Sequence, residues 1–239
     1  MTKNEICQPI FDRHALLSNA MSKDDLKQIQ TLALDVHSMV HLSEISDSDT
    51  ITIADTVFEY MRSRGQNLLV PRENYETDLH YAGTQTVPLC WYFWHTYRIE
   101  DIVSNILVAN QNQIFDSDWQ KRINSPITDT GNALTLRDAI SFGKAIDINS
   151  LREYMIKVGK NTRNIIRQLS LEQIRSMVPE EWVMRILEEG GVTTDFRSVW
   201  LLVFWGRLTR GGMILTPLTA HHMMHLPACL DKILNERFI

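Results

Sequence analysis

The sequence is poor in cysteine and in the residues that interrupt helices. Its 239 residues include 3 cysteines, 10 glycines and 7 prolines. Cys7, Cys90 and Cys229 are too few and too scattered for a disulfide framework or a cysteine-rich zinc site, and they fit a reducing compartment. The low glycine and proline content, together with 44% hydrophobic residues, indicates a folded globular chain with a real core.

The sequence also lacks a long apolar segment and a surplus of basic residues. Its longest apolar run, residues 199–205, is far too short to span a bilayer, and residues 1–20 lack the apolar core of a signal peptide. The formal net charge of −5 provides no basic field for nucleic acid, and no lysine and arginine cluster indicates a membrane anchor. We therefore expect a cytoplasmic protein that binds neither nucleic acid nor membranes.

Helical spacing of apolar residues dominates the rest of the chain. It predicts helices over about 23–44, 52–64, 87–112, 135–146, 150–169, 180–189, 195–208 and 216–237. Residues 1–22 are expected to form an N-terminal extension, and residues 23–239 a single domain. Long amphipathic helices without alternating strand patterns predict an all-α fold, an antiparallel four-helix bundle with additional short helices.

Local signals place several of these helix boundaries. Ser150 and Ser170 each begin a capping-box pattern, so both are expected to start a helix. The pair Gly211-Gly212 is expected to break the chain, and Thr216-Pro217 suits the start of the last helix. Pro227 lies inside that helix and is expected to bend it.

Two histidines of the predicted last helix carry the clearest chemical signal. His221 and His225 are four residues apart, so their imidazoles lie on one helix face and can share a divalent cation if a third ligand arrives from another helix. His95, within the apolar stripe of the predicted helix 87–112, is the candidate for that third ligand. The spacing leaves open that His95 is an ordinary hydrogen-bonded core histidine.

Other histidines could compete for this role. His222 is three residues before His225, so periodicity alone does not exclude it. His37 and His41 repeat the four-residue spacing, and we interpret them as cavity-lining or partly solvated residues. Neither pair has a glutamate directly after its first histidine, which disfavours a zinc peptidase. Glu100 and Asp101 are interpreted as surface charges, helix contacts or outer-shell partners, and are left out of the site.

Three segments resemble the DinB/YfiT-like superfamily, namely residues 36–44, 94–101 and 204–225. The resemblance covers most of the chain from about residue 23. It implies a four-helix bundle whose cavity holds a divalent metal on His95, His221 and His225. Characterised members include S-transferases and isomerases that use bacillithiol or mycothiol, so a low-molecular-weight thiol is the implied cofactor and a homodimer the implied assembly.

Three converging imidazoles would constrain the chemistry. They suit zinc or nickel, leave the double charge of the cation uncompensated, and keep a coordination position open for water or thiol. The predicted function is a metal-dependent thiol S-transferase or hydrolase that acts on a small electrophilic substrate. The alternative is a non-catalytic bundle that binds a small molecule or a protein partner.

Overall fold

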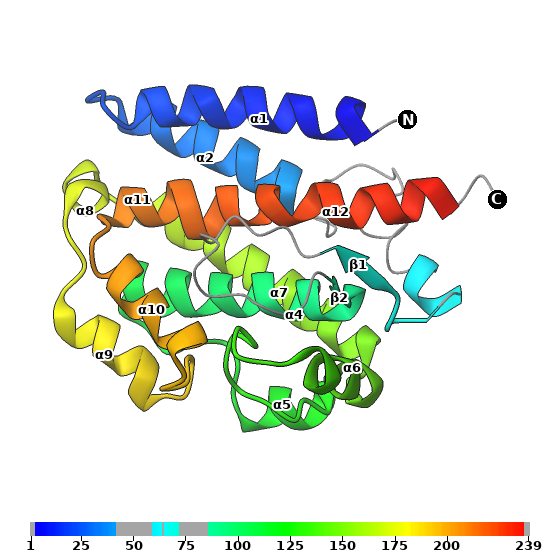
Figure 1. The fold of residues 1–239 in the computed structure, drawn as a ribbon. Coiled ribbons are helices and arrows are strands. Elements are labelled where there is room, and N and C mark those ends of the chain that lie inside the picture. The colour runs from blue at the N-terminus through cyan, green and yellow to red at the C-terminus, as the bar shows by residue number, and fades with distance from the viewer. Residues whose placement is uncertain (1–2, 42–58, 64, 72–85, 237–239) are drawn as a thin grey trace.

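The computed structural model describes residues 3–41, 59–63, 65–71 and 86–236 of the chain (Figure 1). Of the residues in these ranges 72% are helical, and they contain one two-stranded sheet, which confirms the predicted all-α class. The named elements are α1 (Lys3–Ala20), α2 (Leu26–Val40), β1 (Leu69–Pro71), β2 (Thr86–Pro88), α4 (Leu89–Ile102), the π-helix η1 (Val103–Val108), α5 (Ser117–Ile123), α6 (Leu136–Ala145), α7 (Ile148–Gln168), α8 (Leu171–Arg175), α9 (Glu180–Glu188), α10 (Phe196–Trp205), α11 (Arg210–Leu215), the π-helix η2 (Thr216–Ala220) and α12 (His221–Glu236).

Four long helical segments form the bundle. Helix α2 packs on α7, α7 on α4, α4 on α12, and α12 on α2, so the contacts close into a ring. Helices α2 and α12 run in one direction, whereas α4 and α7 run in the other (Figure 1). The parallel course of α4 and α7 requires a long return, which residues 109–147 provide with α5 and α6.

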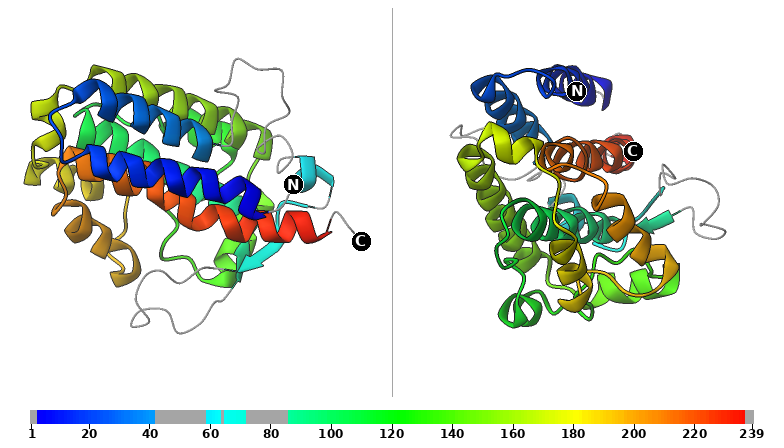
Figure 2. Two further views of the ribbon diagram at one scale, coloured as in Figure 1. Left: turned by 90° about the horizontal axis from the view of Figure 1, so that it is seen from above. Right: turned by 90° about the vertical axis from the view of Figure 1, so that its left-hand side faces the viewer.

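The predicted N-terminal extension contains a helix that the sequence pattern did not reveal. Helix α1 packs on α2 and α12, outside the ring of four (Figure 2). It buries Ile6, Ile10 and Leu17, but polar residues separate these positions and Pro9 lies within the helix. Phe11 and Leu16 are apolar but exposed, so they blur the apolar stripe, and no helix was predicted within residues 1–22.

Helix α4 is the central element of the core. Every residue from Leu89 to Ile102 is buried, including the aromatic cluster at its start, whose large apolar side chains stabilise the core. Ionisable side chains buried in such a helix must find partners inside the protein, because an uncompensated buried charge is costly. The partners of Glu100 and Asp101 therefore locate the polar interior of the bundle.

The start of the last helix was predicted wrongly. Gly211 and Gly212 do not break the chain but lie inside α11, whose N-cap Thr209 accepts a hydrogen bond from the Gly212 N–H through its side chain. Helix α11 continues through η2 into α12. Pro217 has no N–H to donate, and the helix accommodates it by widening to a π-turn, where the Thr219 hydroxyl donates to the carbonyl of Ile214 at 2.7 Å.

Other boundaries were predicted with mixed success. The capping box at Ser170 is confirmed. Helix α7 instead begins after Asp147, whose carboxylate accepts from the Ser150 N–H, so the prediction that Ser150 starts this helix is wrong. Short α5 and the β1–β2 hairpin were not predicted. Of the predicted helix 52–64, only 59–63 lie within the described residues, and they are helical.

Membrane insertion was not expected from the sequence. Among the residues that the structure describes, no helix is both long and apolar enough to cross a bilayer.

Candidate metal centre

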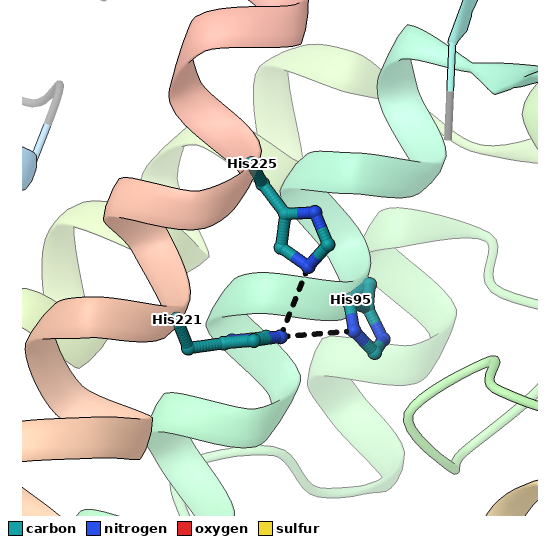
Figure 3. Close-up of side chains that lie close together, drawn as sticks. All are labelled: His95, His221 and His225. Atoms are coloured by element: carbon teal, nitrogen blue, oxygen red, sulfur yellow. Dashed lines mark hydrogen bonds between the residues drawn. The ribbon is translucent and has the colours of Figure 1, made fainter. Parts of the chain in front are cut away.

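A hydrogen bond to a backbone carbonyl holds the His95 ring in one orientation. Its Nδ1 donates to the carbonyl of Thr130 at 2.9 Å, and its ring stacks on Trp91 with centroids 4.5 Å apart and planes 8° from parallel. Donation from Nδ1 makes Nε2 the unprotonated nitrogen of the neutral ring. The lone pair of His95 therefore points toward α12 (Figure 3).

The loop that orients His95 is itself fastened to α4. Four consecutive carbonyls of residues 128–131 each accept a hydrogen bond from an α4 side chain. The donors, in order from Thr128 to Gly131, are Arg98, Trp94, His95 and Trp91. Gly131 has φ +75°, and a Cβ there would lie 2.9 Å from Trp91 Nε1, so this position requires glycine.

His221 and His225 approach His95 from consecutive turns of α12. His221 Nε2 lies 3.1 Å from His95 Nε2 and 3.1 Å from His225 Nε2, so it is the central member of the group (Figure 3). His221 and His95 are buried, and His225 is half-buried. The fold thus brings the three predicted site residues together, although His95 and His221 are 126 positions apart in the sequence.

The donor geometry fits a divalent cation. With metal–nitrogen bonds of 2.0–2.1 Å, neighbouring ligand atoms are separated by about 3.0 Å in an octahedral and about 3.3 Å in a tetrahedral site. The two 3.1 Å separations fall within this range. Burial lowers the pKa of His221 well below its usual value, and the nearby His225 and His95 lower it further. Its ring is therefore neutral, as a ligand must be.

A second group of ionisable residues lies beside the first. Glu100 contacts His37, His41 and His222. Metal-ligand spacing is therefore not confined to the predicted site, because one donor atom each of His37, His41 and Glu100 lie within 4.8 Å of one another. His37 is fully buried and His41 is 3% exposed, so of the two roles expected for them the partly solvated one is wrong, and the cavity-lining one stays a prediction. The signals available for this group were the repeated four-residue spacing of His37 and His41 and the presence of Glu100 in a helix that is buried throughout.

A pocket of about 30 Å³ lies between the two histidine groups. His225 of the first group and His222 of the second both line it, and the remaining walls come from α2, α4 and α12. The Tyr92 ring is 5.0 Å from that of His225. Room for a water needs about 10–15 Å³, so this pocket has space for about two waters beside His225.

Comparisons of the chain with protein-family models, with curated proteins and with solved structures found no match.

Proposed function

We propose that the chain is a divalent-metal-dependent enzyme of the DinB/YfiT type, with His95, His221 and His225 as the metal ligands. The observation that supports this most is that His221 Nε2 lies 3.1 Å from both His95 Nε2 and His225 Nε2, so imidazole nitrogens from two helices converge. The hydrogen bond from His95 to Thr130 adds support, because metal-ligating histidines commonly donate their other ring nitrogen to a carbonyl or carboxylate.

The donor set determines what chemistry the site can support. A divalent zinc or nickel ion on three neutral imidazoles keeps its full charge and an open position, and so acidifies a water or thiol bound there. The chain's part is to hold His95 by the loop 128–131 and to present the half-buried His225 to the pocket. Tyr92 and Leu226 also line this pocket and limit the access of bulk water.

The proposed reaction is transfer of a thiol or water to a small electrophilic molecule. A thiol would come from outside the chain, as a low-molecular-weight cofactor. Burial raises the pKa of Cys90 to about 12, so its thiol is neutral near pH 7 and a weak nucleophile. No carboxylate belongs to the group of His95, His221 and His225, which leaves the charge of the ion available to activate the incoming nucleophile.

Metal content and turnover test this proposal together. The wild-type chain and a His221→Leu variant would be stripped with chelator, reloaded with Zn²⁺ or Ni²⁺, and assayed for bound metal. Thiol consumption with a chlorodinitrobenzene and ester hydrolysis would then be followed with and without the ion. We expect metal-dependent turnover in the wild type that His221→Leu abolishes. Bound metal without turnover would favour a non-catalytic binder, and unchanged metal content in His221→Leu would overturn the site.

A further inference from the structure

Glu100 is a fully buried carboxylate surrounded by imidazoles. Its Oε1 lies 2.8 Å from His37 Nε2, and its Oε2 lies 3.1 Å from His41 Nε2 and 2.8 Å from His222 Nε2. The three histidines come from α2 and α12, so three helices supply this group. Within the described residues, every ion pair of Glu100 is with a histidine.

Hydrogen bonding accounts for only part of this arrangement. The contact from His222 to Glu100 has the right length, but His222 Nε2 is buried without a partner in hydrogen-bond geometry, and so is His37 Nδ1 among the described residues. A buried carboxylate needs a positive charge nearby. Imidazoles can supply it by taking up a proton, or three converging nitrogens can share a cation with the carboxylate.

We propose that Glu100, His37 and His41 form a second divalent-cation site, with His222 as a fourth ligand. This donor set differs from the first by one carboxylate, which neutralises one of the two charges of the ion. Imidazole with carboxylate suits zinc, manganese or ferrous iron. The inference does not depend on the proposed reaction, since it concerns other side chains.

The surroundings of the second group are shaped to hold His41. On α7, a Cβ at Gly159 would overlap the His41 ring, so glycine at this position leaves room for the imidazole. Tyr97 packs edge-on against His41 with centroids 4.6 Å apart, and its hydroxyl lies 3.3 Å from His41 Nδ1. That contact occupies Nδ1 and leaves Nε2 directed at Glu100.

The two groups share one pocket. His221 and His222 are consecutive on α12, with ring centroids 6.4 Å apart, and the pocket of about 30 Å³ is lined by His222 and His225. A small anionic ligand in this pocket would contact a ligand residue of each site. The second ion therefore gives the pocket an additional positive charge.

Metal stoichiometry distinguishes the two sites. The full chain would be stripped with chelator, equilibrated with Zn²⁺ alone, and the bound zinc counted by elemental analysis. We expect two equivalents in the wild type and in the control His14→Gln, which changes a histidine outside both groups. Glu100→Gln and His221→Leu should each retain one. If the wild type binds a single equivalent of zinc and Glu100→Gln retains it, the second site is overturned. If Glu100→Gln loses zinc and His221→Leu loses none, the first site is overturned.

A second variant avoids changing a buried charge. Gly159→Ala alters no ligand but displaces the His41 ring, so it should lose the second equivalent and keep the first. Circular dichroism would verify that the variant is folded. Retention of both equivalents in folded Gly159→Ala would contradict the assignment of His41 as a ligand.

Discussion

Glu100 and Asp101 are consecutive residues of α4, both fully buried, and they are held in opposite ways. Glu100 meets only imidazoles among the described residues. Asp101 accepts hydrogen bonds from five donors, the side chains of Arg98, Asn105 and Tyr154 and the backbone N–H groups of Ile114 and Phe115. Each Asp101 oxygen thus accepts at least two hydrogen bonds.

The difference separates a structural carboxylate from a candidate functional one. The partners of Asp101 are an arginine, which stays charged, and donors that hold no metal in this geometry. They tie α4 to α7 and to residues 113–115 permanently. The partners of Glu100 are imidazoles, whose charge and ligation state can change. One carboxylate therefore fixes the bundle, and its neighbour in sequence belongs to the second histidine group.

The largest expected effect is loss of the structural carboxylate. Asp101→Asn leaves the Arg98 guanidinium buried without its counter-charge, which should lower the free energy of unfolding by about 3–5 kcal/mol. Urea unfolding monitored by circular dichroism in excess chelator would measure it. In the same conditions Glu100→Gln should cost less, about 1–3 kcal/mol, because its imidazole partners can become neutral. Equal losses of unfolding free energy in the two variants would contradict the difference drawn between Asp101 and Glu100.

The next largest effect is the gain in the free energy of unfolding on addition of zinc, which should differ between variants of the two carboxylates. At a free Zn²⁺ concentration one hundred times the dissociation constant, each occupied site raises the free energy of unfolding by about 2.7 kcal/mol. Asp101→Asn should retain the full zinc-induced gain of the wild type. Glu100→Gln and His221→Leu should each lose the contribution of one site. Paired urea-unfolding curves with and without zinc provide the measurement. The same zinc-induced gain in all four proteins would refute the assignment of Glu100 and His221 as ligands.

The first histidine group could be predicted because its signal is local and strong. The spacing of His221 and His225 places two imidazoles on one helix face, and a helix there needs only apolar periodicity. His95 could be named as the third ligand because it lies in the apolar stripe of a predicted helix. The pairing of Ser170 with Gln173 likewise depends on residues three positions apart.

What could not be predicted depends on contacts between distant segments. The ring of His95 is oriented by a backbone carbonyl, that of Thr130, which no side-chain pattern encodes. Helix α4 is buried all round, so periodicity could not show that Glu100 faces α2 and α12. Gly211 and Gly212 suggested a break, but glycine in a helix costs only about 1 kcal/mol each, which tertiary packing can override.

Positioning of His95 by the loop 128–131 should have a measurable but smaller effect on zinc affinity. Gly131→Ala would press a methyl group on Trp91 and disturb the hydrogen bonds around His95, weakening zinc binding about 10- to 100-fold, as loss of outer-shell partners does. Gly65→Ala is the matched control, since Gly65 also has positive φ (+100°) but a Cβ there would meet nothing within 4 Å. Both variants carry similar backbone strain of about 1–3 kcal/mol. Equal affinities would show that the loop does not orient His95.

The smallest effect concerns the alkaline stability of the Asp101 network. Burial and the negative charge of Asp101 raise the pKa of Tyr154 well above 10. The folded phenol stays protonated while the unfolded one ionises near pH 10, so the stabilisation is complete below pH 10 and declines as the pH rises above it. Between pH 10 and 11 the loss should be about 1 kcal/mol, because the unfolded phenol is only half ionised at pH 10. Tyr154→Phe lacks this titrating group, so its urea-unfolding stability should fall less steeply over that interval. Parallel declines in the two proteins would mean that Tyr154 ionises equally in both states, and that Asp101 does not hold its proton.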